Sequence, residues 1–169
     1  MAKSKIMSGD QLLLVLLDCF GGTIPGRLYL EKLSFLSVYE IPELESIKES
    51  FCFKPDKFGM YSENVLKIMD ELKEKNLIIS KTYVSDTQHN KEIFTLTSEG
   101  KGKAKEILEQ IDKNVKKTLL YLCKGAKQLG YSGILRYTYA KYPQFTSESE
   151  IAENVFNSYG LKDEGGMKI

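Results

Sequence analysis

The sequence predicts a mainly helical α+β fold with one small β-hairpin, and three observations lead to this prediction. Apolar residues recur at every third or fourth position in several stretches of the chain. Residues that favour helix caps stand at the start of these stretches. The clear exception is a pair of β-branched and aromatic runs, LIISKTYV and KEIFTLT, which flank a short polar stretch and are typical of two strands joined by a turn.

The first helix is predicted to be a central, buried one. Ser8 and Gln11 have the spacing of a capping box, in which each side chain bonds the backbone of the other residue. Residues 12–17 are all apolar, so every side of this helix is apolar, as in a helix surrounded by the core. The glycine pair at 21–22 is expected to end it.

A second helix is expected to open near Pro25 and to end before Pro42, because the residue that precedes a proline is pushed out of the helical region. Residues 42–50 are predicted to form a connector with room for one helical turn, and residues 51–58 are predicted to be mostly extended. The second helix is expected to bury Leu30, Leu33, Phe35 and Leu36.

A third helix is predicted from Glu63 to Lys75, with Ser62 as its cap and Asn76 as the left-handed residue that ends it. The hairpin follows, and Thr97 is expected to cap the next helix. From Ala104 to Leu129 one apolar stripe continues at helical spacing, which predicts one long helix or two nearly collinear ones. After Gly130 a shorter helix is expected up to Lys141.

This order of elements is typical of a winged helix-turn-helix followed by a C-terminal helical extension. We expect the winged-helix domain to cover residues 1–112. Residues 113–169 are expected to form the helical extension, which serves dimerisation or packing and ends in a frayed tail.

Three stretches carry a resemblance to a known family: GRLYLEKLSFL, FKPDKFGMYSENVLKIMDELKEKNLI and GILRYTYAKYPQFT. They resemble the YwgA-like winged-helix proteins of archaea and bacteria, which are distantly related to the Panacea antitoxin domain. Phe58 and Met60 stand where that family has Tyr and Pro. The segments around the third helix and the hairpin are also similar to the PadR and MarR regulators. That similarity implies DNA binding by the third helix and the wing, with dimerisation by the long helix.

The residues expected to contact DNA surround the third helix and the hairpin. The acidic residues Glu63, Asp70, Glu71 and Glu74 on the same helix would repel phosphates, so we expect the helix to enter a major groove by its amino-terminal end. For His89, near the hairpin tip, an ordinary exposed loop residue is the simpler alternative to a phosphate contact. The predicted DNA-contacting residues are Lys54, Lys57, Ser62, Asn64, Lys67, Lys81, His89, Lys91, Lys101 and Lys105.

The apolar stripe of the long helix is expected to form a homodimer interface, because it is longer than one winged domain can cover. The lysines on its opposite side fit an ordinary solvated face. The predicted interface residues are Leu108, Ile111, Val115, Leu119 and Leu122.

Several function classes are not indicated. The formal net charge of +1 excludes a generally basic surface. The sequence predicts no enzyme, no catalytic residue, no cofactor and no metal site, because the single histidine is distant in sequence from every cysteine and FGGTIPGR lacks the Lys-Ser/Thr of a phosphate loop. The longest uninterrupted apolar run, residues 12–17, is too short to span a membrane, and no signal-peptide pattern is visible. Three widely spaced cysteines fit reduced thiols, so we expect a cytoplasmic protein.

The function expected from the sequence is therefore that of a winged-helix DNA-binding protein, a transcriptional regulator that binds double-stranded DNA as a homodimer. The alternative is a winged helix that serves as a protein-interaction module, antitoxin-like or a subunit of a complex, without sequence-specific DNA binding. The Panacea resemblance and the acidic third helix allow this alternative.

Overall fold

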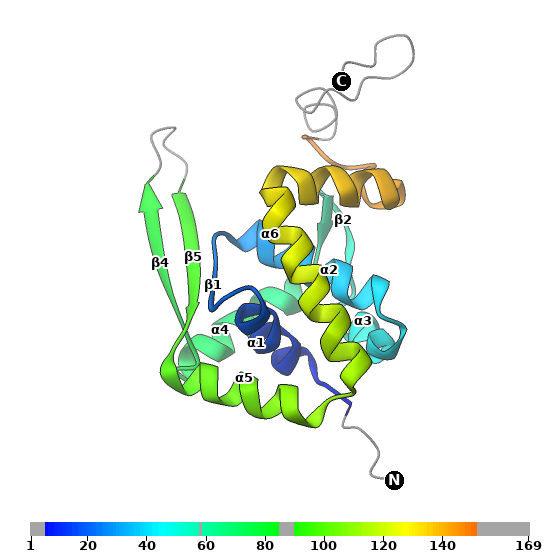
Figure 1. Cartoon of the computed structure of the whole chain (residues 1–169). Coiled ribbons are helices and arrows are strands. Elements are labelled where there is room, and N and C mark those ends of the chain that lie inside the picture. The colour runs from blue at the N-terminus through cyan, green and yellow to red at the C-terminus, as the bar shows by residue number, and fades with distance from the viewer. Residues whose placement is uncertain (1–5, 58, 85–89, 152–169) are drawn as a thin grey trace.

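The computed structural model describes residues 6–57, 59–84 and 90–151, and within them the chain is mainly helical with two small antiparallel sheets (Figure 1). The predicted α+β class is confirmed at this level. In chain order the elements are α1 (Gly9–Cys19), β1 (Thr23–Ile24), α2 (Arg27–Glu40), the 3-10 turn η1 (Pro42–Leu44), α3 (Glu45–Phe51), β2 (Lys54–Asp56), β3 (Gly59–Tyr61), α4 (Glu63–Glu74), β4 (Ile78–Val84), β5 (Asn90–Leu96), α5 (Ser98–Gln110), α6 (Lys113–Lys141) and the 3-10 turn η2 (Pro143–Phe145).

Helix α1 forms the centre of the core, as its apolar run predicts. Every side chain from residue 12 to residue 17 is at most 1% exposed. The backbone N–H of Ser8 donates to Oε1 of Gln11 at 3.0 Å, which is one half of the predicted capping box. Helix α5 packs on α1, and α6 packs on α2 and α1, so the helices at the end of the chain close the core built by those at its start.

Helix α2 is buried on nearly every side from Tyr29 to Val38. Its two serines are accommodated by local hydrogen bonds, because Ser34 donates to the carbonyl of Leu30 and Ser37 donates to that of Leu33, at 2.8 and 2.7 Å. The charged residues Glu31 and Lys32 are buried as well, which the sequence pattern does not predict.

Strands β4 and β5 form the predicted hairpin, and β1 pairs with the other edge of β5, so the strand order is β1-β5-β4. Figure 1 shows this hairpin extending away from the helices. Its inner face is buried at Ile78, Phe94 and Leu96. The predicted site residue His89 lies outside the described residues.

Between α2 and α4 the chain contains more regular structure than the sequence predicts. The expected connector holds helix α3 as well as the turn η1. The expected extended segment contains β2, which pairs antiparallel with β3 just beyond that segment, so the two strands form a second hairpin. Cys52 ends α3 in a left-handed conformation with φ 49°.

The long apolar stripe is divided between two helices that are not collinear (Figure 1). Ile111 is extended, and Asp112 caps α6 by accepting hydrogen bonds from Asn114 N at 2.7 Å and Val115 N at 3.3 Å. Within α6, Gly130 has φ 71° and introduces a kink.

The expected interface stripe requires a correction. Four of its five residues are buried in the core of the single chain, so they are not on a face open to a second chain, and the fifth is partly covered. The stripe is covered by helices of the same chain, because α5 packs on α1 and α6 packs on α2. The buried residues are Leu108, Ile111, Val115 and Leu119, and the partly covered one is Leu122.

Among the helices of the described ranges, none is both long enough and apolar enough to cross a membrane.

Candidate nucleic-acid interface

The hairpin β4–β5 presents its two predicted lysines on the same face. Lys81 is two residues from Tyr83, and Tyr83 is the cross-strand partner of Lys91, so the three side chains share one side of the ribbon. Both lysines are exposed. Their ammonium groups are therefore available to an anionic partner on that face.

The amino-terminal end of α4 does not present the predicted polar side chains. Ser62 is fully buried: its Oγ accepts from Val65 N at 3.2 Å and donates to the carbonyl of Phe51 at 2.5 Å. Asn64 donates from Nδ2 to the carbonyl of Ser50 at 2.7 Å. These two residues attach α4 to the end of α3, so the expectation that they reach base edges is replaced by an internal role.

The exposed face of α4 is more acidic than basic. Lys67 is exposed but lies 3.7 Å from Glu63, and Lys73 is paired with Asp70 at 3.7 Å. The remaining exposed charges are those of Glu71, Glu74 and Lys75. This face would therefore meet more repulsion than attraction from a phosphate backbone.

The other predicted lysines fall into two separate regions. Lys54 and Lys57 are exposed on the β2–β3 hairpin, and the carbonyl of Lys57 accepts from Glu150 N at 2.7 Å beyond η2. Lys101 and Lys105 are exposed one turn apart on α5. This helix runs along the lower edge of the molecule in Figure 1, away from β2. One flat DNA surface cannot contain all of them.

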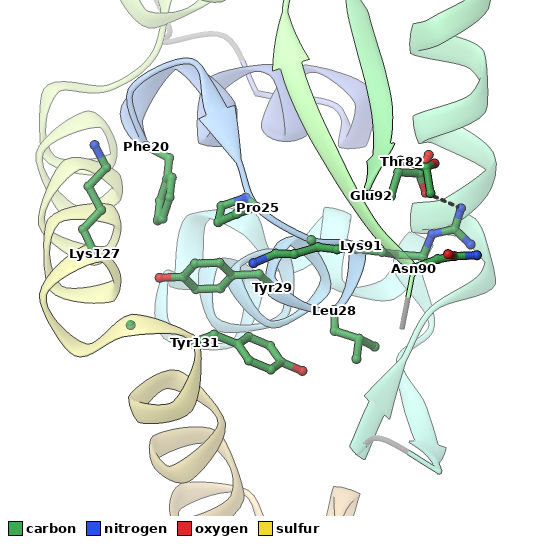
Figure 2. Close-up of a pocket in the computed structure, with 13 residues that line it drawn as sticks. Phe20, Pro25, Leu28, Tyr29, Thr82, Asn90, Lys91, Glu92, Lys127 and Tyr131 are labelled. Atoms are coloured by element: carbon green, nitrogen blue, oxygen red, sulfur yellow. Dashed lines mark hydrogen bonds and ion pairs between the residues drawn. The ribbon is translucent and has the colours of Figure 1, made fainter. Parts of the chain in front are cut away.

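A groove of about 1070 Å³ lies between the β1–α2 turn, the β4–β5 hairpin and the kink of α6 (Figure 2). It is lined by residues 20 and 25–29, by residues 82 and 90–92, and by residues 127, 130 and 131. These three segments are far apart in the sequence. Three of the lining side chains are cationic, Arg27, Lys91 and Lys127, and one is acidic, Glu92.

The floor of the groove is a row of aromatic rings. Phe20 and Tyr29 meet edge to face with centroids 5.1 Å apart, and Tyr29 and Tyr131 do so at 5.7 Å. The hydroxyl of Tyr29 donates to the carbonyl of Ala126 at 2.6 Å, which fixes the row against α6. Lys127 places its ammonium group 5.2 Å from the centre of the Phe20 ring.

Glu92 is an internal counter-ion of the groove wall. Its Oε2 lies 3.1 Å from Arg27 Nη2 and its Oε1 lies 2.9 Å from Lys73 Nζ. Burial alone would raise the pKa of Glu92, but hydrogen bonds from Lys73 and Ser80 and the charges of Lys73 and Arg27 outweigh it and lower that pKa. This carboxylate is therefore ionised and neutralised by its neighbours, so it offers little repulsion to an anion in the groove.

A second group of buried charges lies where α2 meets the β2–β3 hairpin. Lys32 is fully buried, and its Nζ donates to the carbonyl of Met60 at 3.1 Å. Ser62 N donates to Oε1 of Glu31 at 3.4 Å. Burial lowers the pKa of Lys32 to about 8, although Glu31 and Asp56 act in the opposite direction, and burial raises the pKa of Glu31.

Arg27 and Lys127 are the groove residues that sequence reasoning did not select as site residues. Exactly one hundred positions separate them, and no local motif links them. Lys127 belongs to the run of lysines on α6 that fits an ordinary solvated face, so no sequence signal distinguishes it. Within the described ranges no cluster of three or more His, Cys, Asp or Glu side chains is arranged to hold a metal ion.

Neither a family model nor a curated protein sequence matches this chain.

Proposed function

We propose that this chain is a winged-helix DNA-binding protein that acts in the cytoplasm as a homodimeric transcriptional regulator. The element order α1, β1, α2, α4, β4, β5 supports this proposal, as does the strand order β1-β5-β4, in which the β4–β5 hairpin has the position of a wing. One observation carries it: the hairpin extends from the body (Figure 1), and its strand register puts Lys81 and Lys91 on one face.

The proposed contacts are mainly to phosphates. Since Ser62 and Asn64 are used internally, α4 offers only Lys67 near its amino end, and that lysine is already near Glu63. Phosphate contacts give affinity and salt dependence but carry little sequence information. We therefore propose that a single protomer has little preference for one DNA sequence over another.

Charge reversal of the two hairpin lysines tests this proposal. Lys81→Glu combined with Lys91→Glu is expected to weaken binding to every duplex, and to reduce the slope of log affinity against log salt by about two, because each phosphate contact contributes roughly one unit. Electrophoretic shifts with genomic fragments at two salt concentrations measure both quantities. Lys124→Glu, an exposed charge on α6 away from the hairpin, is the matched control. Unchanged affinity of the double variant would refute the wing contact.

The proposed homodimer uses the exposed surface of α6 instead of the buried stripe. Tyr121 is 64% exposed and Leu129 is 56% exposed, and both line an apolar groove of about 320 Å³ between α6 and the end of α2. Exposed apolar side chains that line one groove are typical of interaction surfaces.

Two variants separate this surface from the core. Tyr121→Glu combined with Leu129→Glu is expected to yield a folded monomer in light scattering, because it places charges on the proposed interface. Leu119→Glu is expected to unfold the chain, because Leu119 is fully buried. Wild-type protein that is monomeric at tens of micromolar would show that the dimer proposal is wrong.

A protein-interaction module is the second candidate, and the acidic exposed face of α4 favours it. This face would suit a basic protein partner better than a phosphate backbone. The same DNA assay discriminates between the candidates: no shift of any duplex at low salt would favour the interaction module.

A further inference from the structure

We propose that the groove between the β4–β5 hairpin, the β1–α2 turn and the kink of α6 is a binding site for a small organic anion with a flat apolar body. It borders the outer hairpin face that carries Lys81, and Lys91 belongs to both. Its volume of about 1070 Å³ is slightly above the range of roughly 300–1000 Å³ typical of small-molecule sites.

The charges of the groove favour an anion. Its lining has three positive side chains and one negative one, which leaves an excess of two positive charges. Arg27 and Lys73 neutralise Glu92. Lys91 and Lys127 form no ion pair with any residue that the structure describes. They belong to opposite walls of the groove: Figure 2 shows Lys91 extending toward Tyr29, and Lys127 lying along α6 beside Phe20.

Backbone geometry keeps both walls in place. Gly21 has φ 107°, and a Cβ at this position would lie 2.8 Å from Nζ of Lys127, so glycine leaves room for the lysine beside Phe20. Gly130, with φ 71°, turns the second part of α6 so that Tyr131 joins the floor. Gly26 caps α2 without a side-chain hydrogen bond, so the positive end of the helix dipole adds to the field of the lysines.

The floor favours an apolar, planar body. Phe20, Tyr29 and Tyr131 form the row of edge-to-face rings, and Pro25 and Leu28 add aliphatic surface beside it. A ligand with a ring and a carboxylate or phosphate group would place the ring on this floor and the anionic group between Lys91 and Lys127. Aromatic carboxylates and nucleoside monophosphates share this chemistry.

The probe for this site is 8-anilinonaphthalene-1-sulfonate, a fluorescent aromatic anion. We expect the wild-type chain to bind it, and the double variant Lys91→Gln, Lys127→Gln to bind it roughly tenfold more weakly, because charge-assisted contacts to the sulfonate are lost. Thr82→Trp, which fills the groove from the exposed hairpin, is expected to weaken binding as well. Lys124→Gln removes an exposed charge of the same helix outside the groove and is expected to leave the affinity unchanged.

Competition identifies the ligand class. Displacement of the probe by benzoate indicates an aromatic carboxylate, and displacement by adenosine monophosphate indicates a phosphate ester. Displacement by neither compound at millimolar concentration would overturn the proposal, as would displacement by a single-stranded oligonucleotide alone.

Two further outcomes also count against the site. One is equal probe affinity of the wild type and the lysine double variant. The other is loss of binding in Tyr121→Ser, which changes the apolar groove on the other side of α6 and leaves this groove intact. Thermal unfolding of each variant checks that the fold is retained. Duplex DNA takes no part in these titrations, so this proposal and the DNA-binding proposal can fail separately.

Discussion

Replacing Gly100 with alanine is expected to destabilise the protein by about 3 kcal/mol or more, which is at or above the usual cost of overpacking a core. Gly100 is buried in the first turn of α5, where its N–H donates to Oγ1 of Thr97 at 3.0 Å. An added Cβ would overlap the carbonyl oxygen of Leu77 and would lie 3.1 Å from Cδ2 of Leu96. The Leu77 carbonyl is a backbone group that already accepts from Thr97 N at 3.1 Å, so it cannot rotate away. Helix α5 would have to move off the start of β4.

Gly102→Ala is the matched control, in the same helix and two residues further on. A Cβ at this position meets no atom within 4 Å. The substitution is therefore expected to stabilise the protein by about 0.5–1 kcal/mol through helix propensity alone. Urea unfolding followed by circular dichroism measures both free energies. Similar unfolding midpoints for the two variants would contradict the close approach of α5 to Leu77.

Elements with strong local signals could be predicted from the sequence. Asn76 has φ 58° after α4, and Oγ1 of Thr97 accepts from the first turn of α5, so the predicted left-handed stop and the predicted cap are both present. The hairpin β4–β5 also lies where its β-branched runs predict it. In each of these cases the chemistry that decides the structure is contained in a few neighbouring residues.

Short or fully buried elements could not be predicted in the same way. Helix α3 spans only Glu45–Phe51, too few residues to establish a period, and β2 contains Pro55, which argues against a strand unless it is at an edge. Helix α2 buries charged residues along with apolar ones, so the spacing of its apolar residues predicts less burial than the structure has. These assignments depend on contacts made by distant parts of the chain.

For the candidate site, a polar side chain at the start of a helix can indicate either a DNA contact or a helix cap. Ser62 was correctly predicted as a helix cap, but a capping serine at a buried helix start has its hydroxyl occupied, here by Val65 N and the carbonyl of Phe51. Side chains that cap a buried end are therefore poor candidates for DNA contacts. The groove depends on Arg27 and Lys127, which only the folded chain brings to one place.

The buried Lys32 is expected to make the free energy of unfolding depend on pH. Lys32 has a pKa of about 8 in the folded chain, against 10.5 for an ordinary lysine. Between these two pH values the unfolded chain holds the proton and the folded chain does not, so stability rises with pH in this window. Below about pH 8 both states carry the charge, and the folded state bears the cost of burying it.

The variant Lys32→Met isolates this contribution. It keeps the length and apolar character of the side chain but cannot titrate, and the carbonyl of Met60 loses its donor. The free energy of unfolding of the wild type minus that of Lys32→Met should increase by about 3 kcal/mol from pH 8 to pH 10.5, since each unit of pKa shift corresponds to about 1.4 kcal/mol. The tyrosines are the same in both proteins, so their contribution cancels in the difference. Lys103→Met, which removes an exposed lysine of α5, is the control for the loss of one charge.

A wild-type-minus-Lys32→Met difference that stays constant from pH 7 to pH 10.5 would mean that Lys32 keeps its proton in the folded chain. In that case the negative charges of Glu31 and Asp56 would outweigh the effect of burial on the pKa of Lys32. The junction of α2 with the β2–β3 hairpin would then contain a charged lysine balanced by these two carboxylates.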